Sequence, residues 1–153
     1  MSLTVHITKI EIGAMYEGNI HNRWISGVTK NGKSLKIFDS ELLSYRLENK
    51  MTLEVLISPL NTSGDIIEVT TNMDDTQYLP LVLVQRSWIP HISDYSASHF
   101  GMLANKTKSE LSLVKIFGEY ILIDNSYIPE NTRPSTRYLM REKDYRWDLL
   151  AIV

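Results

Sequence analysis

The pair Asn31-Gly32 constrains the fold of this chain more than any other feature of its sequence. Both residues tolerate a positive φ, so the pair is the preferred two-residue turn of a tight β-hairpin. In that hairpin Lys30 pairs with Lys33, and the alternation along each strand assigns every other residue to one of two faces. The predicted core face carries Trp24, Val28, Leu35 and Ile37. The predicted outer face carries Ile25, Thr29, Lys30, Lys33, Lys36 and Phe38.

A second hairpin is predicted over residues 113–123, turned at Gly118-Glu119, because a glycine in the first turn position suits a type II′ turn. Both of its faces are largely apolar. One face holds Val114, Ile116, Ile121 and Ile123, and the other holds Leu113, Lys115, Phe117, Tyr120 and Leu122. A hairpin of this kind lies centrally in a sheet or beneath a helix.

Alternating apolar residues predict further strands. In the first strand the alternation changes phase near Thr8-Lys9, which indicates a β-bulge. The other expected strands are residues 51–57, followed by a turn marked by Pro59 and Ser63-Gly64-Asp65, and residues 66–71, 81–84, 138–141 and 147–153. Two short helical segments are expected as well, one capped by Asp39-Ser40 and running through Leu47, and one over residues 94–106.

The composition excludes several classes of function. The chain has 153 residues and no cysteine, so disulfides, thiolate zinc sites, iron–sulfur clusters and cysteine nucleophiles are excluded. The N-terminus does not resemble a signal peptide, and no segment approaches the ~20 apolar residues of a membrane span. We therefore expect a single cytoplasmic domain over residues 1–153, without membrane contact. The net charge of −2 counts against nucleic-acid binding without excluding it.

Residues 27–34 spell G-x-x-x-x-G-K-[ST] and so resemble the phosphate-binding loop of P-loop nucleotide hydrolases. Tyr120 to Asp124 is similar to the second motif of that family, a strand that ends in a metal-directed aspartate. The resemblance covers 13 residues, and it implies an ATP or GTP site in which Lys33 reaches the phosphates. The residues of that alternative are Gly27, Gly32, Lys33, Ser34 and Asp124. The polar run before Gly27 and the lack of alternating β and α segments favour a lysine-bearing hairpin instead.

The outer face of the first hairpin gives a second alternative. Basic side chains beside an aromatic ring are the combination that a single-stranded nucleic acid needs, with charge for phosphates and a ring for bases. The residues of this predicted face are Lys30, Lys33, Lys36 and Phe38. A bent first strand, a hairpin, and then the strand at residues 51–57 look like the opening of an OB-type barrel, a family that uses this face. The fold expected is therefore mainly β, an antiparallel OB-like barrel or a sandwich, with one or two short helices.

The remaining polar clusters predict no catalytic residue and no cofactor or metal. His91, Asp94 and His99 match no metal-binding spacing, and Asp74-Asp75 is typical of a turn. Tryptophan, tyrosine and arginine gather near Trp88 and in the last 20 or so residues, as at many interfaces. The primary expectation is thus a binding or interaction module without catalysis. The sequence does not identify its partner and leaves a protein, a second copy of the chain and a nucleic acid open.

Overall fold

The computed structural model describes residues 2–44, 50–61, 69–70, 78–88, 111–128, 137–141 and 145–153. In these ranges the chain is almost entirely β. The strands are β1 (Leu3–Ile12), β2 (Met15–Tyr16), β3 (Asn19–Ile20), β4 (Arg23–Thr29), β5 (Ser34–Asp39), β6 (Thr52–Asn61), β7 (Val69–Thr70), β8 (Tyr78–Gln85), β9 (Leu111–Ile116), β10 (Glu119–Asp124), β11 (Arg137–Arg141) and β12 (Tyr145–Ile152), with a 3-10 helix η1 (Asn125–Tyr127). The prediction of a mainly β chain is confirmed. The helix predicted over residues 94–106 lies outside the described residues.

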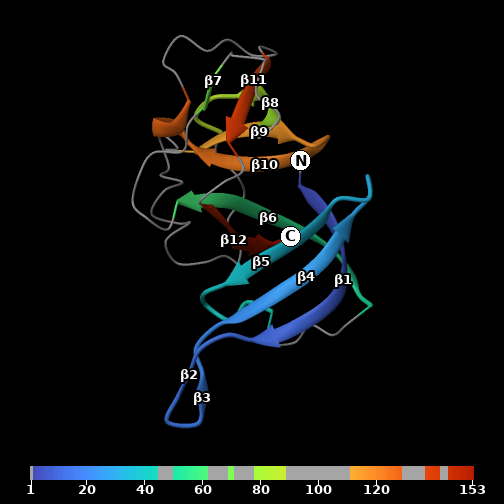
Figure 1. Cartoon of the computed structure of the whole chain (residues 1–153), viewed down its shortest axis with the longest axis vertical. Coiled ribbons are helices and arrows are strands. Elements are labelled where there is room, and N and C mark those ends of the chain that lie inside the picture. The colour runs from blue at the N-terminus through green and yellow to red at the C-terminus, as the bar shows by residue number, and fades with distance from the viewer. Residues whose placement is uncertain are drawn as a thin grey trace.

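Five strands close into a barrel in the order β1-β4-β5-β12-β6 (Figure 1). Neighbouring strands are antiparallel except β5 and β12, which run parallel. In chain order the barrel strands follow one another as first, second, third, fifth and fourth, which is consistent with an OB-like barrel. The predicted barrel is therefore confirmed, and the structure adds that it is closed.

A second sheet, of order β10-β9-β8-β11-β7, is formed by the chain between β6 and β12 and lies against the barrel (Figure 1). One buried cluster joins the barrel interior, including Ile37 and Leu149, to Leu83 and Ile121 of this sheet. A second cluster joins barrel residues Leu56, Leu150 and Ala151 to Leu111, Leu113 and Leu122. Both faces of the β9–β10 hairpin are buried in this way, which explains why its sequence is apolar on both sides.

The first hairpin has a register one residue away from the predicted one. Thr29 and Lys33 close the hairpin, with Thr29 N donating to Lys33 O at 2.9 Å, so the loop has three residues. Gly32 supplies the positive φ of 81° at its last position, the usual arrangement of a three-residue loop. A slip of one residue moves every side chain of one strand to the other face. Consequently Trp24 and Val28 lie outside, whereas Ile25 and Thr29 are buried.

The second hairpin differs from its prediction by two residues, which leaves the faces unchanged. Ile116 pairs with Glu119, and the turn residues are Phe117 and Gly118, both at positive φ, so the turn is of type I′ rather than II′. Val114 pairs with Ile121 on the predicted common face. The assignment of apolar faces is confirmed, and the turn position is corrected.

Three local predictions about the barrel strands have mixed outcomes. The pairing of β1 with β4 shifts between Ile7 and Lys9, which confirms the bulge. Pro59 does not end its strand, because β6 continues to Asn61 and Pro59 pairs with Trp147 of β12. The Asp39 carboxylate accepts hydrogen bonds from the N–H groups of Leu43 and Ser44, but residues 40–44 form turns instead of a helix.

Candidate nucleic-acid interface on the barrel

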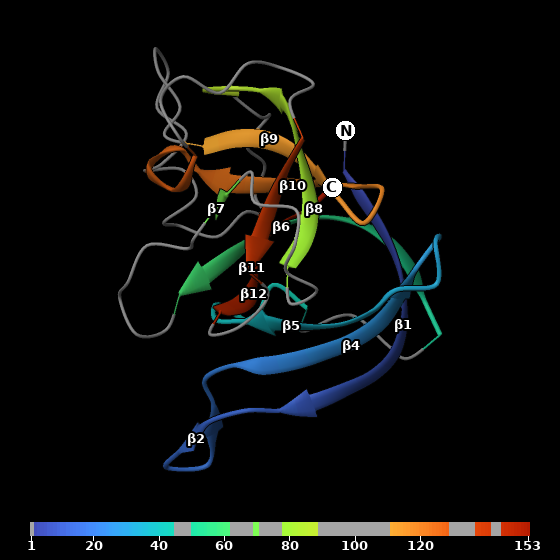
Figure 2. The ribbon, with the colours of Figure 1, turned by 45° about the horizontal axis from the view of Figure 1, so that its top comes forward.

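A continuous row of residues crosses the five barrel strands on their outer face. Glu11 of β1 pairs with Trp24 of β4, and Trp24 pairs with Phe38 of β5. Phe38 lies beside Asp148 of β12, which in turn pairs with Ser58 of β6. Strands β1, β4 and β5 run side by side in Figure 2 and form the first part of this surface. We call these five residues the outer row.

Trp24 and Phe38 form an aromatic pair in the middle of the outer row. Their ring centroids are 4.8 Å apart at an interplanar angle of 49°. Both side chains are only half-buried, because they stand on the outside of the barrel. A cation lies over each ring: the Lys36 Nζ is 4.8 Å from the Trp24 centroid, and the Arg146 guanidinium is 4.0 Å from that of Phe38. The pair thus presents ring surface and positive charge together.

The position of Arg146 is set by Asp148. The Arg146 Nε and Nη2 atoms donate to the two carboxylate oxygens of Asp148 at 2.6 and 3.1 Å, which makes a bidentate ion pair. Asp148 is buried at 6% exposure, whereas the Arg146 side chain remains 27% exposed. The guanidinium is therefore held over Phe38 by a fixed carboxylate and keeps a part of its surface open to solvent.

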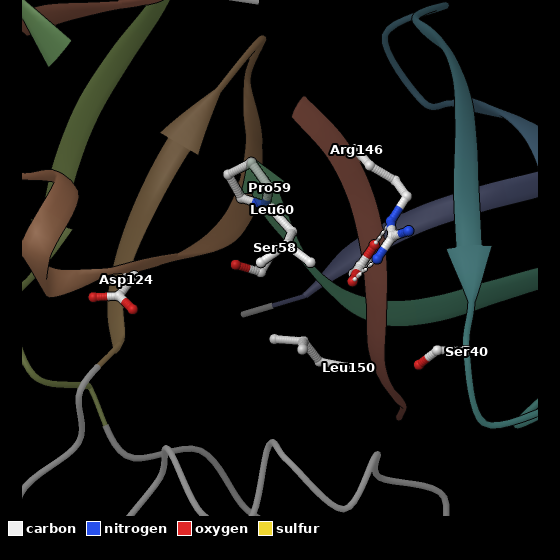
Figure 3. A pocket seen from close by; sticks show the side chains of 8 residues that line it. Ser40, Ser58, Pro59, Leu60, Asp124, Arg146 and Leu150 are labelled. Carbon is white, nitrogen blue, oxygen red and sulfur yellow. Dashed lines mark hydrogen bonds and ion pairs between the residues drawn. The ribbon is translucent and has the colours of Figure 1, made fainter. Parts of the chain in front are cut away.

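A pocket of about 270 Å³ lies where the outer row reaches β12 and β6 (Figure 3). Its polar side chains are Ser40, Ser58, Asp124, Arg146 and Asp148. Its apolar side chains are Pro59, Leu60 and Leu150. Asp124 comes from β10 of the second sheet, so the pocket sits between the two sheets. Because Asp148, Ser58 and Arg146 belong both to the pocket and to the surface beside Phe38, the two features are continuous.

The structure separates the lysines that the sequence placed on one face. Lys36 lies on the outer face with Phe38, as predicted. Lys33 does not, because the three-residue loop turns its side chain toward the second hairpin, where Nζ is 5.8 Å from the Phe117 ring. Lys30 is exposed in the loop and near Glu119. Burial raises the pKa of the Glu119 carboxyl above its ordinary value, while Lys30 and Lys115 act in the opposite direction.

Residues 27–34 do not adopt the geometry of a phosphate-binding loop. Gly27 lies within β4, Gly32 is in the hairpin loop, and Ser34 begins β5, so a strand follows where a P-loop requires a helix. Asp124 belongs to the second sheet, where its side chain accepts a hydrogen bond from Ser126 N at 2.8 Å. The structure instead shows the lysine-bearing hairpin that the sequence favoured for these residues.

The sequence assigned Trp24 to the core face, counted Arg146 only among the clustered arginines typical of interfaces, and did not predict Asp148 or the pocket. Only the turn type decides the face of Trp24, and only the pairing of β12 with β5 brings Arg146 and Asp148 beside Phe38. The candidates His91, Asp94 and His99 lie outside the described residues, as does Asp74-Asp75. Among the residues that the structure describes, no group of histidines and carboxylates is arranged to hold a metal ion. No helix in the described ranges is long and apolar enough to span a bilayer.

Comparisons with protein-family models, with curated proteins and with solved structures found no match to this chain. The chemistry of the outer face is therefore the basis on which a function can be proposed.

Proposed function

We propose that this chain is a binding module for single-stranded nucleic acid, which it holds on the outer face of β4, β5 and β12. The observation that carries the proposal is the Trp24–Phe38 pair with Lys36 and Arg146 over its rings. OB-type barrels bind oligonucleotides on the face of their second and third strands, and β4 and β5 are the second and third strands of this barrel. The corrected register supports the proposal, because it adds a tryptophan to the predicted face.

Stacking and charge would contribute separately to such binding. A base stacked on an aromatic side chain contributes about 1–3 kcal/mol, and this term depends little on sequence or salt. A phosphate would be met by Lys36, because Arg146 is already neutralised by Asp148. One phosphate contact on a single strand gives a slope of log K against log salt of about −0.7. The net charge of −2 provides no long-range attraction, so we expect moderate affinity dominated by stacking.

The test is a fluorescence anisotropy titration with end-labelled oligothymidylate and oligouridylate of about 15 nucleotides, long enough for one OB-type barrel. The two probes distinguish DNA from RNA. Trp24→Leu and Phe38→Leu each remove a ring and keep an apolar side chain, and each is expected to weaken binding about tenfold. Tyr16→Leu is the matched control, because Tyr16 is 66% exposed on the separate β2–β3 hairpin. Binding that both ring variants leave unchanged would contradict the proposal.

A second candidate function is protein association through the β2–β3 hairpin. This hairpin projects from the barrel (Figure 1), and Met15 and Tyr16 are 56% and 66% exposed on it, with Ile12 at its base 55% exposed. Exposed apolar side chains that lie together mark interaction surfaces. Sedimentation velocity over a range of protein concentrations tests self-association, and Met15→Ser should reduce any dimer that forms. A purely monomeric chain whose behaviour is unaltered by this variant would exclude a homo-oligomer built on the hairpin.

A further inference from the structure

The pocket is placed to receive part of a nucleic acid that lies on the aromatic pair. Asp148 is on the strand next to Phe38, and Ser58 is one strand further. Neighbouring strands are about 4.8 Å apart, so Ser58 is about 10 Å from Phe38. A strand of nucleotides that crosses the outer row therefore continues from the rings into the pocket.

The polar lining of the pocket is rich in hydrogen-bond acceptors. Both oxygens of Asp148 already accept from Arg146, which leaves the guanidinium neutralised. Asp124 differs, because its Oδ1 accepts from Ser126 N and its Oδ2 accepts from no residue in the part of the chain that the structure describes. The lining thus carries two carboxylates and one guanidinium, which Asp148 already neutralises. A net negative lining repels a phosphate and favours a group that donates hydrogen bonds.

The geometry points to a base-binding subsite that prefers guanine, with Asp124 as the residue that reads it. Guanine alone among the common bases has two adjacent donors on its pairing edge, the ring N–H and the 2-amino group, which together match one carboxylate. Adenine and cytosine place an acceptor beside their amino group, and thymine and uracil place acceptors on both sides of their ring N–H. The volume of about 270 Å³ is slightly below the range of drug-sized pockets, which suits a single base.

The apolar part of the pocket supports the same occupant. Leu60 and Leu150 offer apolar surface for the flat faces of a base, and Ser40 and Ser58 offer hydroxyls to its remaining edge atoms. The inference rests on the proposed function, because it takes the rest of the oligonucleotide to lie on Trp24 and Phe38.

The experiment compares three end-labelled probes in anisotropy titrations: oligothymidylate of about 15 nucleotides, the same probe with one central guanosine, and the same probe with inosine at that position. Inosine lacks the 2-amino donor and is otherwise like guanosine. We expect the guanosine probe to bind about tenfold more tightly than oligothymidylate, and the inosine probe to lose most of that preference.

Asp124→Asn tests the residue. The asparagine retains an oxygen for Ser126 N and is itself a favoured cap, so η1 is preserved, while a donor replaces the free acceptor. The ratio of guanosine to inosine affinity should fall to about one. Glu11→Gln is the matched control, since it removes the same charge from the other end of the outer row. Glu11→Gln should raise the affinity for all three probes alike, because it reduces repulsion of the phosphates, and should leave the ratio of guanosine to inosine affinity unchanged.

Equal affinities for the three probes would overturn the guanine subsite and leave the proposed function standing. A guanosine preference that persists in Asp124→Asn would also overturn the assignment to Asp124. If no probe binds, the proposed function itself fails, and the subsite fails with it.

Discussion

Gly27 is the residue of the 27–34 segment whose substitution tests the observed hairpin most sharply. In the barrel Gly27 pairs with Ile7, next to the bulge of β1. A Cβ atom placed on it would lie 2.5 Å from Val5 Cγ2 and 2.7 Å from the carbonyl oxygen of His6. The second contact is with backbone of the neighbouring strand, so it cannot be relieved by a change of rotamer. We expect Gly27→Ala to destabilise the fold.

The magnitude follows from these two contacts. Overpacking in a well-packed region costs about 1–3 kcal/mol, and a clash with fixed backbone belongs at the upper end of that range. A loss of about 3 kcal/mol lowers the Tm of a chain of this size by roughly 6–12 °C. Gly32→Ala is the matched control, since a Cβ there meets nothing within 4 Å and costs only the left-handed backbone at φ 81°, about 1–2 kcal/mol.

The assay is urea unfolding of the two variants and the wild type, followed by tryptophan fluorescence. The urea concentration at the unfolding midpoint should fall for both variants, and should fall further for Gly27→Ala, with little change in m-value. Equal stability of Gly27→Ala and wild type would refute the close approach of β1 and β4 and with it the proposed register. A loss of stability in Gly32→Ala without any loss in Gly27→Ala would also refute this close approach and register.

Three further predictions concern interactions that hold the two sheets and the first hairpin in place. Asn31→Ala removes donors to Phe117 O and Glu119 Oε1, at 3.3 and 3.4 Å, and should cost about 1 kcal/mol in the same unfolding assay. Asp39→Ala leaves the buried N–H and hydroxyl of Ser44 without their acceptor, so we expect a loss of about 3 kcal/mol and faster amide exchange at Ser44. Glu119 has a pKa raised by burial, so the folded state binds its proton more tightly than the unfolded state does. The contribution of this proton to the free energy of unfolding is complete below pH 4.5, the ordinary pKa, and is lost as pH rises through the higher folded pKa. Glu119→Gln should remove this decline from a series of unfolding midpoints measured over pH.

The two hairpins show how far local sequence patterns predict this fold. Alternation located the strands of both, because a half-buried or buried strand needs a run of apolar residues whatever its neighbours are. The turn residues determined the pairing less reliably, since Asn31-Gly32 fits either the second and third positions of a three-residue loop or the whole of a two-residue loop. An error of one residue reversed the faces of β4 relative to β5, whereas an error of two in the second hairpin had no effect on its faces.

The candidate site was less predictable than the fold, because it is assembled from distant parts of the chain. Phe38 and Lys36 could be assigned to an outer face from their own hairpin. Arg146 and Asp148 reach that face only through the parallel pairing of β12 with β5, and no local pattern specifies a pairing between segments so far apart. Asp124 was noted for a different reason, as the end of a supposed nucleotide-binding motif, and the structure places it at the pocket instead.

The insertion of the second sheet between β6 and β12 has a consequence for synthesis on the ribosome. Strands β1, β4, β5 and β6 emerge first, but β5 and β6 have no common neighbour until β12 is made. Until then the nascent barrel has two open edges, which are prone to pair with other chains, so we expect a dependence on chaperones during translation. Arg146 and Asp148 arrive with that last strand. Prematurely terminated chains would therefore lack both the closed barrel and the Arg146–Asp148 ion pair beside Phe38, so under the proposed function only finished molecules would carry the complete face.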